Sequence, residues 1–366
     1  MIIKISYNIS MKKRLPVIII AILGLIAIVV IAIFGAVSGA RQSLKKTAES
    51  DAPVLDAELT EEDQESDVEQ DKEQKQVWKD GWVKYQGEIY QYKEDIITLL
   101  VIGTDQHKTN KASGEYSGGQ ADLLILMVLD PTTQRIEIIP INRNTITDID
   151  FYDNDGNLTG TVKGQIAVQH GVGDGKEKSC EYQVKAVSRL MYQLPIHGYI
   201  SMRRDGVIPL ADAIGGVDVV VPEDAVTPSF SYKKGQELHL TGKKAMNFVW
   251  DRDHELGGAD RRLDRQKVFM KALFSQLLPA IKANPTIITT IYNDVSGYIT
   301  TDISLNEMLY LGSTCAKYTY DASSFHSILG ETKEGEVSDE FYPDTDKLKE
   351  LMIDVFYEKV DLSKEG

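Results

Sequence analysis

The sequence DLLILMVLD at 122–130 is apolar at nearly every position, and it decides the fold. Two similar runs flank it, ITLLVIG at 97–103 and RIEIIPI at 135–141. An unbroken apolar run of this length is typical of a strand buried on both faces, as in the centre of a layered α/β sheet. We therefore expect these runs to form strands of a sheet that helices cover on both sides.

Strand and helix patterns alternate along the rest of the chain. Apolar residues at helical spacing predict helices at 180–194, 206–214, 243–250, 265–281, 305–318 and 344–359. Short strands are predicted at 198–202, 217–221 and 297–300. This order predicts an α/β protein, a layered α/β/α sandwich around a central mixed β-sheet. We expect the main domain at 78–280, opened by an aromatic hairpin, while residues 281–366 either extend the same domain or form a small appendage.

The N-terminal segment predicts a membrane anchor. No charged residue occurs from Leu15 to Ala40, so a helix there would exceed the roughly 30 Å of hydrocarbon in a bilayer. The basic cluster KKR at 12–14 favours a cytoplasmic segment at 1–14, a transmembrane helix at 15–38 and an extracytoplasmic remainder. The alternative is a signal peptide cleaved near the small residues at 38–40. Both interpretations export the domain, and the first predicts a single-pass protein of the bacterial cell membrane.

Residues 39–77 predict an acidic, disordered linker. Within them, DAPVLDAELTEEDQESDVEQDKEQKQ at 51–76 contains no aromatic residue. Such a segment buries too little apolar area to offset the entropy of ordering. Repulsion between its acids would keep it extended and hold the domain away from the membrane face.

Charge and cysteine content exclude several classes of protein. The formal net charge is −15, whereas binding to nucleic acid phosphates needs clustered cations, so we expect no nucleic acid partner. The chain has two cysteines, Cys180 and Cys315, too few for a disulfide framework. A single bridge and two separate buried thiols both stay open.

Two aspartates lie at predicted strand ends. Asp105 follows the first apolar run and Asp122 begins the second, and layered sheets place ligands at such edges. Two carboxylates brought together would hold a hard cation such as Mg2+, which takes oxygen ligands and often bridges phosphates. The alternative is that one aspartate caps a loop and the other only ends a strand.

Arginines follow in later loops. Arg143 lies directly after the third apolar run, where it is either a phosphate clamp or part of a surface turn. Arg262 and Arg265 open the long helix and oppose its dipole, which indicates either compensation by neighbouring aspartates or an anionic ligand. The planar fork of arginine suits pyrophosphate. We interpret His254 and its acidic neighbours as a solvated loop, because no second histidine or cysteine accompanies it.

Taken in order, these clusters resemble the LytR-CpsA-Psr domain from about Ile97 to Leu278. The strand ending in Gly-x-Asp is VIGTD at 101–105, and Asp122 matches the later aspartate before an apolar strand. NRNT at 142–145 corresponds to the family's Pro-Arg-Asp-Thr element. The other matching stretches are HGVGDGKEKSC at 170–180, similar to a loop of clostridial members, DAIGGVDV at 212–219, GKKAMNFV at 242–249 and DRRLDRQ at 260–266.

The resemblance implies a phosphotransferase that moves a glycopolymer from an undecaprenyl-pyrophosphate carrier to peptidoglycan, with the lipid inside the sandwich. The implied site comprises catalytic Asp122, Arg143 and Arg252, pyrophosphate-binding Arg143, Arg252, Arg262, Arg265 and Gln266, and Mg2+ as cofactor on Asp105 and Asp122. The metal and the arginines would stabilise charge on the leaving lipid phosphate while a sugar hydroxyl attacks the other phosphorus. No covalent enzyme intermediate is needed.

Two positions depart from the family's pattern. Asn144 stands where the family has Asp after its Arg, and Trp250 replaces the first Arg of a Val-Arg-x-Arg element. The anion clamp is then one cation short, a loss of roughly 2 to 5 kcal/mol unless Arg261 or another cation substitutes. The alternative function is therefore a degenerate member that binds polyprenyl-pyrophosphate lipid or wall polymer without turnover. The exported, acidic domain disfavours a transcriptional regulator.

Overall fold

A computed structural model describes residues 39–46, 48, 52–55, 79, 81–105, 118–153, 155–253, 257–336 and 338–364. The predicted transmembrane helix at 15–38, Trp78 and most of the predicted linker lie outside this part of the chain. No helix within the described part is both long enough and apolar enough to cross a bilayer.

The three apolar runs form the centre of a five-stranded sheet. Its order is β13 (Ile299–Thr301), β8 (Tyr199–Arg203), β3 (Ile97–Thr104), β4 (Ala121–Asp130) and β5 (Arg135–Ile141). Strands β3 and β8 are parallel, whereas the other neighbouring pairs are antiparallel. The sheet is therefore mixed, which confirms the predicted α/β class and its central mixed sheet.

Helices α4 (Glu177–Leu190) and α10 (Thr345–Phe356) cover one face of this sheet. Leu100 and Ile102 of β3 are fully buried against this layer, together with Leu124 and Leu126 of β4. Val54 belongs to a short segment, residues 52–55, whose Ala52 and Leu55 pack on the same core. The backbone N–H of Val54 donates to the carbonyl of Tyr192 at 2.6 Å.

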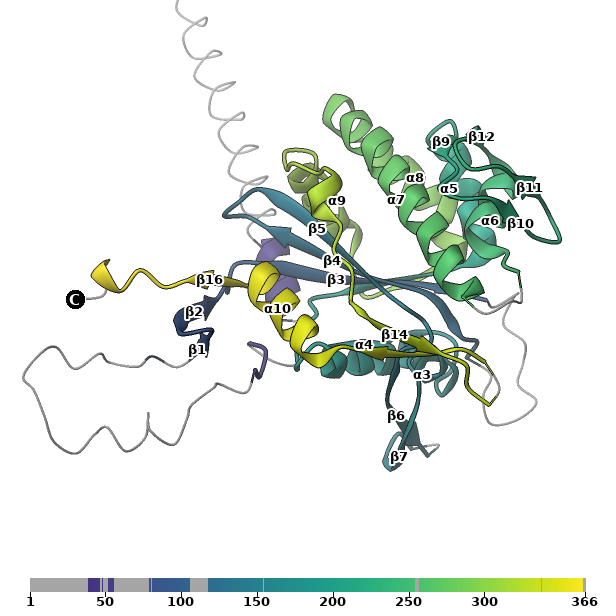
Figure 1. Cartoon of the computed structure of the whole chain (residues 1–366). Helices are drawn as coiled ribbons and strands as arrows, with labels where there is room; N and C mark the ends of the chain where they lie inside the picture. Colours follow the sequence, from purple (N-terminus) through teal and green to yellow (C-terminus); the bar gives the residue numbers. More distant parts are fainter. Residues whose placement is uncertain are drawn as a thin grey trace, which may run out of the picture.

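Helices α7 (Gly258–Ala283) and α9 (Leu305–Cys315) cover the opposite face (Figure 1). Leu99 and Ile125, one residue out of phase with the first set, pack here against Phe274 and Leu311. Residues 39–46 are helical, and Leu44 is 2% exposed within this second core. The predicted linker therefore does not include residues 39–46, because an apolar side chain fixes them to the body.

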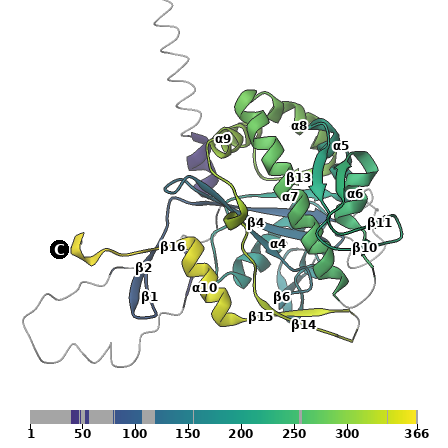
Figure 2. The same ribbon diagram turned by 45° about the horizontal axis from the view of Figure 1, so that its top comes forward.

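A smaller lobe lies beside α7 (Figure 2). It contains η1 (Arg204–Gly206), α5 (Val207–Ala213), β9 (Val217–Val220), β10 (Ala225–Val226), β11 (Ser231–Tyr232), β12 (Glu237–Leu240), α6 (Gly242–Trp250) and α8 (Ile287–Val295). Val217, Leu240 and Phe248 are buried in its core with Phe269 and Leu273 of α7. One helix thus serves both the sheet and the lobe.

Residues 281–366 complete the main domain. Strand β13 joins the central sheet beside β8, and Phe325 bridges Ile138 of β5. Strand β16 (Tyr357–Lys359) pairs with β2 (Glu88–Tyr92), which pairs with β1 (Trp82–Tyr85). The helix predicted at 344–359 ends at Phe356 because the last residues pair with β2. Of the two alternatives, the structure has the extension of the same domain.

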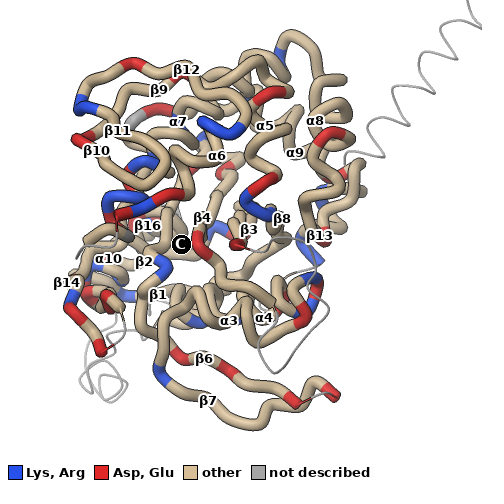
Figure 3. Tube along the Cα trace, turned by 90° about the vertical axis from the view of Figure 1, so that its right-hand side faces the viewer, with Lys and Arg blue, Asp and Glu red and all other residues tan. Residues whose placement is uncertain are grey.

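Two features of the described chain were left open or missed by the sequence. Cys180 and Cys315 are both free thiols, buried in the cores on opposite faces of the sheet, so they form no bridge. Strands β6 (Ile146–Tyr152) and β7 (Leu158–Gln165) form a hairpin that projects from the body (Figure 3).

The remaining elements are α3 (Val168–Gly171), η2 (Ser296–Tyr298), η3 (Ala322–Ser324), β14 (Gly330–Lys333), β15 (Glu340–Pro343) and η4 (Leu362–Lys364).

Candidate active site

Three predicted site residues meet at one end of the sheet. Asp122 is the second residue of β4, Arg143 follows β5, and Arg262 comes from the first turns of α7. Oδ1 of Asp122 lies 2.6 Å from Nη1 of Arg143 and 3.3 Å from Nη2 of Arg262. All three side chains are at most 10% exposed. A single buried carboxylate thus bridges two buried guanidinium groups.

The electrostatics of this cluster favour an anionic ligand. Burial lowers the pKa of Arg143, and it lowers the pKa of Arg262 to about 10, which leaves Arg262 cationic at neutral pH. The positive charge of Arg252 lowers the same two pKa values further, whereas Asp122 opposes the shift. Nη2 of Arg143 donates to Gln120 Oε1, but its Nε is buried without a hydrogen-bond partner. Positive charge exceeds negative charge, and a buried donor stays unsatisfied.

Asp105 follows the last residue of β3, and its backbone N–H donates to the carbonyl of Gln120, two residues before Asp122. Its Oδ1 accepts a hydrogen bond of 2.9 Å from the backbone N–H of Gln120, and its charge raises the pKa of Arg143. No group of three or more histidine, cysteine, aspartate or glutamate side chains gathers as a cation site within the described part of the chain. Two aspartates at one sheet edge fit Mg2+, which commonly takes one or two carboxylates and completes its shell with phosphate and water.

Arg265 and Gln266 lie elsewhere than the sequence predicted. Nε of Arg265 donates to the carbonyl of Phe248 at 3.1 Å, and its Nη2 donates to the carbonyl of Asp251. Nε2 of Gln266 donates to the carbonyl of Val249 at 3.0 Å. Arg265 is 1% exposed. These two side chains satisfy the carbonyls at the end of α6 and so fix the segment that carries Arg252, instead of lying beside Asp122.

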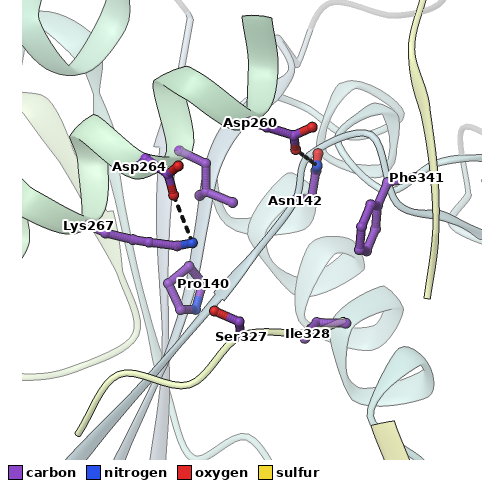
Figure 4. Close-up of a pocket in the computed structure, with 9 residues that line it drawn as sticks. Pro140, Asn142, Asp260, Asp264, Lys267, Ser327, Ile328 and Phe341 are labelled. Carbon is purple, nitrogen blue, oxygen red and sulfur yellow. Dashed lines mark hydrogen bonds and ion pairs between the residues drawn. The ribbon is translucent and has the colours of Figure 1, made fainter. Parts of the chain in front are cut away.

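The loop that carries Arg143 is held from the C-terminal side. Asn142 Nδ2 donates to Asp260 Oδ1 at 2.6 Å, and the other oxygen of Asp260 accepts from Thr332. The carbonyl of Asn144 accepts from the backbone N–H of Phe341 at 2.9 Å. Figure 4 shows Asn142 and Asp260 pointing toward one another, in contact, among the residues that line the pocket beside this loop. Sequence reasoning missed these positioning residues, although Asn142 and Asp260 lie close in sequence to predicted arginines.

An apolar cavity of about 130 Å³ lies between the sheet and α7, next to the polar cluster. It is lined by Val101, Ile102, Gly103, Leu123, Ile200, Met202, Arg204, Val207, Leu210, Val249, Trp250, Gln266, Phe269, Met270 and Leu273. Trp250 connects the two regions, because the centroid of its ring lies 6.0 Å from the guanidinium carbon of Arg262. An apolar cavity that ends beside excess positive charge fits an amphiphile with an anionic head.

Comparison with known proteins adds to this geometry. The model of the LytR_cpsA_psr family matches residues 54–354. The chain is 28% identical over 252 residues to the polyisoprenyl-teichoic acid–peptidoglycan teichoic acid transferase TagV of Bacillus subtilis, covering 67% of this chain and 59% of that protein. It is 30% identical over 193 residues to TagU of Oceanobacillus iheyensis, covering 52% of this chain and 55% of that protein. The chain thus spans less than two thirds of either relative.

Solved structures show the same fold. The crystal structure of Bacillus subtilis TagV superposes with a TM-score of 0.55 at 26% identity, covering 70% of this chain and 94% of that chain. A LytR-Csp2A-Psr enzyme from Actinomyces oris superposes with a TM-score of 0.52 at 18% identity, covering 72% and 93%. The second likeness, at its low identity, supports the fold alone.

Proposed function

Because the chain belongs to the LytR_cpsA_psr family, we propose that it is a phosphotransferase that attaches a glycopolymer, carried on undecaprenyl pyrophosphate, to peptidoglycan. The observation that carries the proposal is the bridge of Asp122 between Arg143 and Arg262 beside an apolar cavity. The relatives named above are teichoic acid transferases, which supports an anionic glycopolymer as the transferred group.

In this proposal the cavity holds the lipid next to its phosphates. Arg143 and Arg262 bind the pyrophosphate, and Arg252 adds a third positive charge that lowers the pKa of both. The acceptor hydroxyl attacks the phosphorus that bears the sugar, its proton is released, and the bond to the lipid phosphate oxygen breaks with the electron pair on that oxygen. The arginines lie where this negative charge develops, so they stabilise the leaving group. Arg265 and Gln266 act through the segment that they fix.

Three further parts of the proposal rest on the sequence. Mg2+, held by Asp105 and Asp122, would neutralise phosphate charge and polarise the bond to the leaving group. A transmembrane helix at 15–38 would anchor the chain in the cytoplasmic membrane with its N-terminus inside. The domain would then lie outside the membrane, on the side where peptidoglycan is built.

The test uses the 366-residue chain in detergent, a synthetic polyprenyl-pyrophosphate disaccharide, a peptidoglycan fragment and Mg2+. We expect release of polyprenyl phosphate together with a covalent acceptor product, and loss of both in Arg143→Ala. Lys163→Ala on the exposed β6–β7 hairpin is the matched control, since its side chain is 70% exposed and, among the described residues, pairs with Asp148.

Two other outcomes separate the alternatives. Binding without release under any divalent metal would identify a non-catalytic lipid-binding member, as Asn144 and Trp250 suggest. If the lipid does not bind, or if Arg143→Ala releases product as fast as the unaltered chain, the proposed site is wrong.

A further inference from the structure

We propose that Arg204 is an additional pyrophosphate-binding residue, positioned by Trp250, and that it supplies the cation missing at position 250. This inference rests on the proposed function. It concerns the one site residue at which the chain departs from the family's arginine pattern while its neighbours Arg252 and Arg262 are kept.

Arg204 lies at the same end of the sheet as the candidate site. It begins η1 directly after β8, and β8 is parallel to β3, whose end carries Asp105. The guanidinium carbon of Arg204 lies 5.5 Å from the ring centroid of Trp250, and that of Arg262 lies 6.0 Å from the same centroid. One indole thus draws two guanidinium groups toward it by cation–π attraction. Arg204 thus shares an aromatic neighbour, Trp250, with the arginine that contacts Asp122.

The second observation is the position of Arg204 in the wall of the apolar cavity. Among the described residues that line the cavity, Arg204 is the one with a charge. A cation beside an apolar volume loses hydration, which is unfavourable unless an anion or an aromatic face compensates it. A lipid in the cavity would place its phosphates at this boundary, between Arg204 and Arg262.

Two neighbouring arginines are not among the described residues that line the cavity, and each contacts a carboxylate. Arg261 binds Asp253 through two hydrogen bonds, one of them 3.0 Å from Nε to Oδ2. Arg203 lies 5.2 Å from the ring centroid of Tyr298 and 3.5 Å from Asp205. Arg261, which sequence reasoning considered as the substitute, is therefore occupied. Arg204 is the neighbouring arginine that contacts Trp250 and lines the cavity.

The test measures binding of farnesyl pyrophosphate and farnesol to the 366-residue chain in detergent by calorimetry. We expect Arg204→Gln to raise the Kd for farnesyl pyrophosphate about tenfold, the size of one charged hydrogen bond, with the Kd for farnesol changed less than about twofold. Arg203→Gln, the adjacent arginine, is the matched control and should leave both values unchanged. Adding Trp250→Arg to Arg204→Gln should restore pyrophosphate affinity, because position 250, which contacts position 204, then supplies the positive charge.

Equal effects of Arg203→Gln and Arg204→Gln would overturn the inference, as would a double variant that binds no better than Arg204→Gln alone. Thermal unfolding of each variant shows whether a loss of affinity reflects loss of folding, and rescue by the double variant excludes that explanation. If Arg143→Ala weakens binding and Arg204→Gln does not, this inference fails alone. If Arg143→Ala has no effect, the proposed function fails as well.

Discussion

Oδ1 of Asp122 lies 2.6 Å from Nη1 of Arg143, in a cluster where a second arginine shares the same oxygen. The carboxylate and an incoming phosphate are both anions, so they compete for the same donors. Asp122 should therefore affect binding and catalysis in opposite ways. It holds the two arginines in place, but its negative charge repels the phosphates of the substrate.

Asp122→Asn should therefore bind the substrate headgroup at least as tightly as the unaltered chain when divalent metal is absent. Transfer in the presence of Mg2+ should fall about a hundredfold or more, the scale of losing one electrostatic contact to a transition state. Calorimetry in chelator and a polyprenyl phosphate release assay measure the two quantities. A parallel loss of binding and transfer would contradict the separation.

Arg265→Lys should lower the free energy of unfolding by about 2 to 4 kcal/mol, because a lysine cannot satisfy the carbonyls that the guanidinium spans. Those carbonyls belong to Phe248, Asp251 and Arg261. Arg262 lies three residues before Arg265 in α7 and contacts Asp122. Arg262→Lys should therefore mainly reduce transfer. Urea unfolding followed by tryptophan fluorescence compares the pair. Equal stability losses would mean that both arginines serve the fold alike.

Filling the apolar cavity should separate lipid binding from headgroup binding. Ile200 of β8 lines the cavity, and Ile200→Trp should raise the Kd for farnesyl pyrophosphate about tenfold through lost apolar burial. The Kd for inorganic pyrophosphate should stay the same. Val220→Trp is the control, because Val220 is 54% exposed on β9. Unchanged farnesyl binding in Ile200→Trp would place the lipid elsewhere.

Folding should weaken in mild acid through His197. Its Nδ1 accepts from the backbone N–H of Thr98 at 3.1 Å, and burial lowers its pKa from 6.5 to about 4. The unfolded chain therefore binds the proton more tightly, and stability falls as the pH drops from about 6.5 toward 4, by up to about 3 kcal/mol. His197→Asn keeps an acceptor near Thr98 and removes the titration. Its unfolding free energy should vary less with pH in that window; an identical pH profile would assign the effect to other groups, such as buried His170.

The central strands could be predicted because a strand that is buried on both faces has apolar residues at nearly every position. The run RIEIIPI coincides with β5, and the other two runs differ from β3 and β4 by one residue at one end. Strand β7 was missed because it reads LTGTVKGQ and is mostly exposed. Pairing with β6, and not burial of an apolar face, makes it a strand.

The resemblance predicted three of the residues that meet at the sheet edge, but not the hydrogen-bond partners of the others. The resemblance brought Asp122, Arg143 and Arg262 together, and the structure does the same. The apolar periodicity of the long helix starts at Arg265, whereas α7 begins at Gly258, because its first turns bury arginines where periodicity expects apolar side chains. Arg265 was predicted to bind pyrophosphate because a charged residue at a helix start indicates a ligand. Its buried carbonyl partners, which cannot be seen in the sequence, show that it holds the end of α6 instead.

Segments 39–46 and 52–55 both pack on the body, and this changes the expected role of the acidic stretch that follows them. Leu44 is fixed in the core on one face of the sheet, and Leu55 packs on the core of the other. Residues 52–55 and the β1–β2 hairpin both belong to the folded unit, so the stretch between them is attached to that unit at both ends. Lengthening the acidic stretch would then change the entropy of loop closure, by about 0.6 kcal/mol per doubling of its length. It would not change the distance between the domain and the membrane. An anchor at 15–38 would then be followed directly by helix 39–46, whose Leu44 is buried in the body.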